Sequence, residues 1–209
     1  MKKLIIVITA VIALVLPQFA HAELNTDIRV KLGSAPGATK YEVGGLSTDL
    51  SRDGGGNFQA EVAFSPVQEN PIGYVFGVGL FGRTHKGNDN SVPQTHVEYD
   101  AAGLSLTGGI GYKASPGFHF EGKGGLDLGS GKPKFSTPSQ PIDSGGYSAL
   151  SLILGGYYTV SKPGFQIGLE LGAQTWRGNF RMQNGFGQWI DSYVRGDGGF
   201  ANLVVGVRF

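Results

Sequence analysis

The segment "THKGNDNSVPQTH" (84–96) contains the residue types that enzymes use for acyl transfer. His85 and His96 lie near its two ends, Ser91 lies between them, and Asp89 supplies a carboxylate. A serine, a histidine base and an acid that orients the base would form a nucleophilic triad. Two imidazoles and a carboxylate would equally suit a metal ion.

The spacing of these residues favours neither chemistry. The chain has no His-x-Ser pair on a strand and no Gly-x-Ser-x-Gly nucleophile elbow. Histidines in solvated loops are common, and they explain the segment better than either chemistry. We therefore predict no catalytic residue, no metal and no cofactor, and retain His85, His96 and Ser91 as the residues at which catalysis would be tested.

A second segment, "WRGNFRMQNGFGQWIDSYVRGDGG" (176–199), interleaves aromatic side chains with arginines. Binding surfaces use this combination for a protein ligand, a sugar or phosphate groups. The candidate ligand-binding residues are Trp176, Arg177, Phe180, Arg181, Phe186, Trp189, Tyr193 and Arg195.

Eight segments with strictly alternating apolar side chains must position these residues, and the chain shows hardly any helical periodicity. Alternation over such lengths is the period-2 signal of strands with one apolar face. The segments span 27–32, 57–64, 74–83, 103–113, 117–129, 147–160, 165–176 and 200–209.

The fifth of these segments, "GFHFEGKGGLDLG" (117–129), separates apolar from charged side chains most clearly. Successive side chains of a strand point to opposite faces. If the apolar face meets lipid, the charged face lines the interior of a barrel, where nearly balanced charges should form an ion-paired plug. The predicted interior ionic network comprises Arg29, Lys31, Glu61, Arg83, His119, Glu121, Lys123, Asp127, Glu170 and Arg208.

The connections between the segments alternate between short and long. "ASPG" (114–117) and "SKPG" (161–164) are tight turns and 65–73 is short, whereas 33–56, 84–102, 129–146 and 177–199 are long. Short turns at one end and long loops at the other are typical of outer-membrane barrels. The apolar-face residues nearest the short end are all aromatic, as a periplasmic girdle predicts: Phe64, Tyr74, Tyr112, Phe118, Tyr158, Phe165 and Phe209.

The N-terminus has the pattern of a secretory signal peptide. Lys2 and Lys3 precede an apolar run that ends before the cleavage pattern Ala20-His21-Ala22. We predict a cleaved signal peptide at 1–22 and a barrel domain at 23–209. The whole chain has 17 basic and 16 acidic residues and no cysteine, so without Lys2 and Lys3 the balance is 15 to 16. A nucleic-acid partner, which requires a concentrated basic face, is not expected.

The C-terminal "LVVGVRF", which ends in Phe209, resembles the terminal signature of outer-membrane β-barrels. The plan of eight strands and four long loops is similar to small barrels of the OmpX/Ail and OmpA transmembrane-domain type. The resemblance implies an all-β fold, an eight-stranded antiparallel up-and-down transmembrane barrel in the bacterial outer membrane. It also implies a monomer in contact with outer-membrane lipids and lipopolysaccharide, whose last strand the barrel-assembly machinery reads.

Three functions follow as expectations from this resemblance. The first is a non-enzymatic surface protein whose loops serve adhesion, ligand or host contact, or envelope integrity. The second is a lipid-modifying enzyme, such as a lipid A deacylase or acyltransferase, and the third is a narrow, porin-like pore. Two alternatives stay open. In the first, the strands predicted at 165–176 and 200–209 extend beyond the membrane, and the rings of 176–199 form an upper girdle or cover the barrel mouth instead of binding a ligand. In the second, the fold is a soluble periplasmic β-sandwich.

Overall fold

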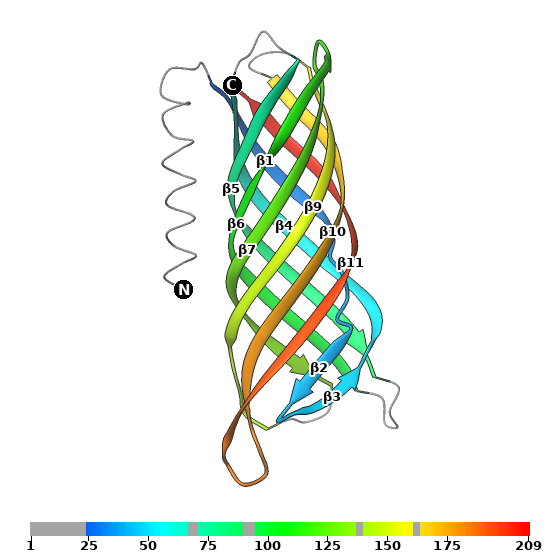
Figure 1. Cartoon of the computed structure of the whole chain (residues 1–209), viewed down its shortest axis with the longest axis vertical. Helices are drawn as coiled ribbons and strands as arrows, with labels where there is room; N and C mark the ends of the chain where they lie inside the picture. Colours follow the sequence, from blue (N-terminus) through cyan, green and yellow to red (C-terminus); the bar gives the residue numbers. More distant parts are fainter. Residues whose placement is uncertain (1–23, 67–70, 90–94, 137–139, 161–163) are drawn as a thin grey trace.

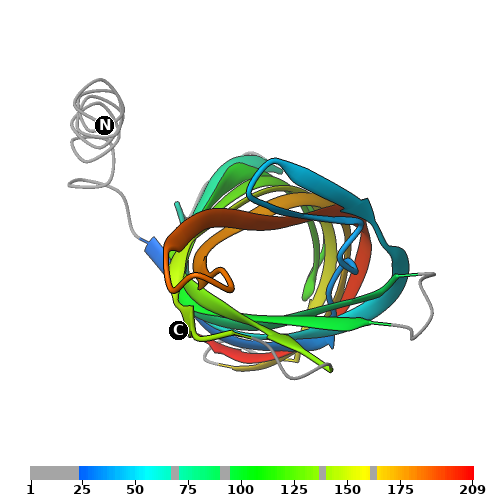
Figure 2. The ribbon, with the colours of Figure 1, turned by 90° about the horizontal axis from the view of Figure 1, so that it is seen from below.

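A computed structural model describes residues 24–66, 71–89, 95–136, 140–160 and 164–209. The predicted signal peptide and Ser91 lie outside these ranges. Eight long antiparallel strands, each hydrogen-bonded to the next, form the wall of a barrel, and pairing of the first strand with the last closes it (Figures 1 and 2). The strands are β1 (Leu24–Ser34), β4 (Ser51–Pro66), β5 (Ile72–Asn88), β6 (His96–Ser115), β7 (Phe118–Phe135), β9 (Gly145–Thr159), β10 (Gly164–Gln183) and β11 (Trp189–Arg208).

Three short strands lie at the end of the barrel where the long connections were predicted. β2 (Lys40–Val43) and β3 (Leu46–Asp49) form a hairpin, and β2 pairs with β11. The two-residue β8 (Ile142–Asp143) pairs with β10. Figure 1 shows the β2–β3 hairpin beside β11 at the lower end, which we call the outer end. The opposite, inner end holds the C-terminus and the start of β1, where Thr26 and Phe209 exchange backbone hydrogen bonds. Within the described ranges, no helix is long and apolar enough to cross a membrane.

The strands run further toward the outer end than the sequence predicted. β4 begins at Ser51, β6 begins at His96, β7 continues to Phe135, and β10 and β11 pair up to Gln183 and Trp189. The prediction of 177–199 as a long connection was therefore wrong, because only 184–188 joins the two strands, and the alternative in which these two strands extend is correct. The physical reason is that polar, glycine-rich backbone still needs hydrogen-bond partners, and continuing the antiparallel ladder supplies them.

Apolar side chains cover the outside of the barrel on every long strand. Leu152, Leu154 and Leu169 are 73%, 72% and 63% exposed, values that would be costly in water over so large a surface. The aromatic residues predicted as a girdle also face outward at the inner end, with Phe64 half-buried and the other six exposed. This outer surface fits a lipid bilayer and is unlike that of a soluble sandwich, so the chain has the fold of an outer-membrane β-barrel.

Glycines on the lumen side make room for large side chains. A Cβ added at Gly155 would collide with the Tyr157 ring, and one added at Gly178 would collide with the ring of Tyr99. Gly117, in the turn between β6 and β7, has a φ of 80°, a value that favours glycine.

Candidate functional site

The inner half of the lumen holds a buried ionic network centred on Arg29. Its guanidinium donates to both carboxylate oxygens of Glu121 at 2.8 and 2.6 Å, to Asp27 at 2.5 Å and to Gln166 at 2.9 Å. Arg208 donates to both oxygens of the same Asp27 at 2.6 and 2.7 Å. Bidentate contacts of this kind are the strongest that arginine makes with carboxylates.

Two lysines extend the network toward the middle of the barrel. Lys123 lies 2.8 Å from Glu121 and 2.9 Å from Glu170, and Lys31 lies 3.0 Å from Glu170 and also contacts Glu61. The Tyr157 hydroxyl donates to Glu170 at 2.5 Å. All these charged groups are almost completely buried, and each has an opposite charge in contact.

The network ends toward the outer half with Arg83, whose guanidinium donates to Asp127 at 2.5 Å and to Asn57 at 2.9 Å. The ten residues predicted from alternation all lie on the lumen side. Asp27, missing from that prediction, is also part of the network, although it has the same parity as Arg29 and was therefore detectable. Apart from His119, the network contains Arg29, Lys31, Arg83, Lys123 and Arg208 against Asp27, Glu61, Glu121, Asp127 and Glu170, and is formally neutral.

A cavity of about 620 Å³ lies at the inner end, and His119, Glu121 and Arg208 are among the residues that line it. Ligand atoms of Asp27, His119 and Glu121 lie within 4.8 Å of one another, as a metal site would require. Arg29 and Arg208 already bind both carboxylates, and the Arg208 guanidinium lies 3.2 Å from His119 Nε2. Two guanidinium groups in these positions would repel a divalent cation, which favours an ion-pair network over a metal centre.

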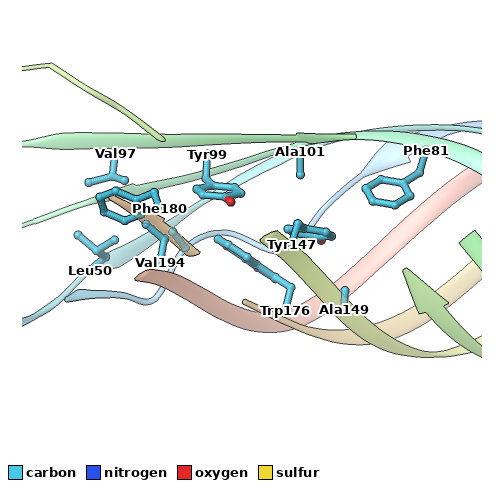
Figure 3. Close-up of a cluster of buried hydrophobic side chains, with 11 residues drawn as sticks. Leu50, Phe81, Val97, Tyr99, Ala101, Tyr147, Ala149, Trp176, Phe180 and Val194 are labelled. Atoms are coloured by element: carbon cyan, nitrogen blue, oxygen red, sulfur yellow. The ribbon is translucent and has the colours of Figure 1, made fainter. Parts of the chain in front are cut away.

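The outer half of the lumen is filled by a different kind of cluster. Tyr99, Tyr147 and Trp176 point toward one another from β6, β9 and β10, with ring centroids 5.7 to 6.2 Å apart (Figure 3). Phe180 extends the cluster toward the outer end of the barrel, and Phe81 extends it in the opposite direction, toward the ionic network. The cluster as a whole contains Ala38, Leu50, Phe81, Val97, Tyr99, Ala101, Tyr147, Ala149, Trp176, Phe180 and Val194.

His85 is buried within this aromatic cluster. Its ring stacks on Trp176 at 3.9 Å between centroids, its Nδ1 lies 2.7 Å from the Pro36 carbonyl oxygen, and its Nε2 lies 3.0 Å from the Tyr147 hydroxyl. A carbonyl only accepts, so Nδ1 donates to Pro36 and Nε2 accepts from Tyr147. Burial lowers the pKa of His85 to about 3, against the opposing effect of the Pro36 carbonyl, and the ring is therefore neutral at pH 7.

The two histidines among the candidate catalytic residues are not brought together in the described structure. His85 points into the lumen, whereas His96 lies on the outward face of β6 and its Nδ1 contacts Asn88 at 2.6 Å. Ser91 lies in the undescribed segment 90–94. Asp89 is buried and accepts a hydrogen bond from the backbone of Thr95 at 2.8 Å. Two histidines on opposite faces of the wall do not form the base of a shared catalytic site.

The candidate binding residues divide between the two faces of the β10–β11 extension. Trp176 and Phe180 are buried in the lumen, as expected if the rings of this segment cover the barrel mouth. The other six are directed outward or lie at the tip: Arg177, Arg181, Phe186, Trp189, Tyr193 and Arg195.

These outward side chains form arginine–aromatic contacts. The Arg177 guanidinium lies 4.1 Å from the centroid of the Tyr193 ring, and that of Arg181 lies 5.5 Å from the Trp189 ring. Tyr193 donates to Glu42 on β2, and this hydrogen bond raises the pKa of the tyrosine. Phe186, at the tip, is 92% exposed. This face carries the rings and guanidinium groups that a binding surface uses.

Comparison with known proteins identifies the fold. OprG from Pseudomonas aeruginosa has 12% sequence identity and a TM-score of 0.54, over 90% of this chain and 97% of that one. Ail of Yersinia pestis in complex with a heparin analogue has 17% identity and a TM-score of 0.41, over 90% of this chain and 99% of that one. AlkL in lipid bilayers has 16% identity and a TM-score of 0.39, over 87% of this chain and 90% of that one. No protein-family model and no curated protein matches the sequence. The likeness to OprG supports the small outer-membrane barrel fold alone.

Proposed function

We propose that this chain is a non-enzymatic surface protein of the bacterial outer membrane, which binds a ligand or host surface through the outer part of β10 and β11. The observation that carries the proposal is the division of the β10–β11 extension into two faces. Its lumen side completes a packed interior, whereas its outward side carries the exposed Arg177, Arg181, Trp189 and Arg195 and the half-buried Tyr193.

The filled lumen argues against the pore alternative. The ionic network occupies the inner half and the aromatic cluster the outer half, and an eight-stranded barrel is only wide enough for such side chains. Purified barrel in a planar bilayer is therefore expected to give no single-channel steps. Stable steps of uniform conductance would contradict the proposal.

The enzyme alternative has no assembled site in the described residues, because His85 is stacked inside the aromatic cluster and His96 faces outward. The lipid A mass spectrum of cells that produce the protein is expected to match that of cells without it. A deacylated or acylated product that disappears in the Ser91→Ala variant would favour the enzyme.

The first test of the proposal is location. The mature chain should fractionate with the outer membrane and, unboiled in detergent, run as a compact band that shifts on boiling. A soluble chain whose mobility heat leaves unchanged would contradict the barrel in the membrane.

The second test is binding by the outer tip. Cells that display the wild type should adhere to at least one surface in a panel of cultured cells, matrix proteins and glycans. A Phe186→Ser/Trp189→Ser double variant should lose this adherence, because both rings are at the exposed tip. Lys134→Gln, an exposed change on β7, is the matched control and should retain adherence. Equal adherence by wild type and tip variant across the panel would refute a binding role for the tip.

A further inference from the structure

Five residues form a single cross-strand row on the outer face of the barrel. Leu128 on β7 is in register with Ser148 on β9, Ser148 with Arg177 on β10, Arg177 with Arg195 on β11, and Arg195 with Lys40 on β2. The row begins at a side chain in the apolar surface and reaches three adjacent cations. Residues directly opposite in an antiparallel pair have Cβ atoms about 5 Å apart, and like charges there are destabilising.

These three cations have no carboxylate partner within 4.0 Å among the described residues. The contrast with their surroundings is clear, because most other outward cations at this end are paired. The pairs are Arg52–Asp197 at 2.9 Å, Lys86–Glu98 at 3.6 Å, Lys134–Asp100 at 2.6 Å and Arg181–Asp143 at 2.7 Å.

The nearest acidic residues are engaged elsewhere or out of reach. Glu42, two residues from Lys40, accepts a hydrogen bond from Tyr193, and Asp197, two residues from Arg195, pairs with Arg52. Asp49 is in register with Lys40 but makes no ion pair with it. Arg177 and Arg195 therefore keep their positive charges without an ion pair on the outer wall, and Lys40, although it lies opposite Asp49, makes no ion pair either.

Arg177 is held in a fixed orientation within this row. Its Nε donates to Asn179 at 3.1 Å and its guanidinium packs on the Tyr193 ring at 4.1 Å. Its two terminal nitrogens have no hydrogen-bond partner in the part of the chain that the structure describes. A guanidinium oriented in this way presents two parallel donors, the geometry that phosphate oxygens accept.

The height of the row identifies the source of the phosphate. A tilted strand crosses the hydrocarbon core with roughly nine to eleven residues. Counted from Phe165, the eleventh residue of β10 is Thr175, and Arg177 is the next side chain on the same face. The row thus lies at the headgroup level and on the outer wall, away from the exposed tip at Phe186.

We propose that Arg177, Arg195 and Lys40 bind the phosphate groups of an outer-leaflet glycolipid, the lipid A part of lipopolysaccharide. This inference rests on the proposed function, since it names the ligand of the lower part of the same outward face. The inference depends on the row alone and does not depend on the residues at the exposed tip.

The test is native mass spectrometry of the folded full-length mature barrel in detergent, titrated with bis-phosphorylated lipid A or with the same lipid after removal of its phosphates. The Arg177→Gln/Arg195→Gln variant should bind the phosphorylated lipid about tenfold more weakly or worse, since two charge-assisted contacts are removed. Lys134→Gln, an exposed change on β7 outside the row at a lysine that is ion-paired to Asp100, is the matched control and should bind as the wild type does.

The remaining outcomes overturn the inference. Equal binding of phosphorylated and dephosphorylated lipid A would show that the row does not recognise the phosphate groups. Full competition by inorganic phosphate at millimolar concentration would show a free-ion site, and preference for a heparin fragment over lipid A would show a soluble-glycan site. Tip-dependent adherence of displaying cells would persist in any of these cases, so failure here is distinct from failure of the proposed function.

Discussion

The two halves of the lumen are filled in opposite ways by the same strands. Around Arg29 and Lys123 the inner half is packed with charged groups that contact one another, whereas around Trp176 and Tyr147 the outer half is packed with rings. A buried ion-pair network is stable only when every member has its partners, since an unpaired buried charge is costly. An aromatic cluster depends on shape and buried area and tolerates the loss of one hydrogen bond: the buried Trp176 Nε1 has no acceptor among the described residues.

The two kinds of lumen filling also indicate where the membrane lies along the barrel. Ionic groups fill the lumen at the level of the lipid-facing leucines, where the wall separates them from lipid. The rings occupy the part that rises above, where β10, β11 and the 35–38 segment enclose them. Ala38 donates its backbone N–H to Lys86 at 2.8 Å, so this segment after β1 closes over the cluster. The outer half thus resembles the core of a soluble protein, and the inner half does not.

The largest expected effect comes from breaking the network at its most connected carboxylate. Glu121→Gln removes the charge that Arg29 and Lys123 share. We expect a loss of about 3–5 kcal/mol in the free energy of unfolding, because two buried cations lose a partner. Urea unfolding of the barrel reconstituted in lipid vesicles, followed by gel mobility, measures it.

Asp197→Asn is the matched control for that change. It breaks the exposed Arg52–Asp197 pair, whose side chains are 56% and 62% exposed, and surface pairs contribute only about 0–1 kcal/mol. Equal losses in the two variants would mean that the lumen of the inner half is as well hydrated as the surface.

A somewhat smaller effect is expected in the outer half. Trp176→Ala removes a ring that packs on His85, Tyr99 and Tyr147, and a cavity of this kind costs about 3 kcal/mol. Trp189→Ala, at the exposed outer end of β11, should stay within about 0.5 kcal/mol in the same unfolding assay. A Trp176→Ala barrel as stable as the wild type would show that the cluster packs loosely and that the two halves differ less than their side chains suggest.

Much of this architecture was predictable from local alternation. The parity of Phe118 and Phe120 against His119 and Glu121 places rings in lipid and charges in the lumen, because a regular strand cannot do otherwise. The same alternation continues along β10, where it places Gln174, Trp176 and Phe180 on the lumen face. The extension of both strands was therefore open to prediction as an alternative, but describing 177–199 as a loop assigned no faces to its side chains.

The features that local alternation could not reveal depend on pairing between distant segments. Lys40 meets Arg195 only because the β2–β3 hairpin folds back onto β11, 155 positions later in the chain. His85 and His96 face opposite sides because β5 and β6 pair in the register that sets Asn88 against His96. Sequence spacing suggested proximity of the two histidines but carried no information about this register.

The smallest expected effect is a pH dependence of the free energy of unfolding that arises from His85 in the outer half. The folded pKa of His85 is lowered to about 3 from an ordinary 6.5, so its neutral form contributes stability above pH 6.5 that is lost as pH falls toward 3. The unfolded chain takes up the proton first, which lowers the free energy of unfolding by about 1.4 kcal/mol between roughly pH 7.5 and 5.5.

The matched variant for this effect is His85→Gln, which retains a donor for Pro36 and an acceptor for Tyr147 but cannot titrate. Urea unfolding at both pH values gives the free energy of unfolding of the wild type and of the variant. The difference between the two proteins isolates the contribution of His85, because the carboxylates and His119 are common to both. A difference that does not change with pH would mean that the His85 ring is accessible to water in the folded barrel, and that the outer half is not the dry core that its rings indicate.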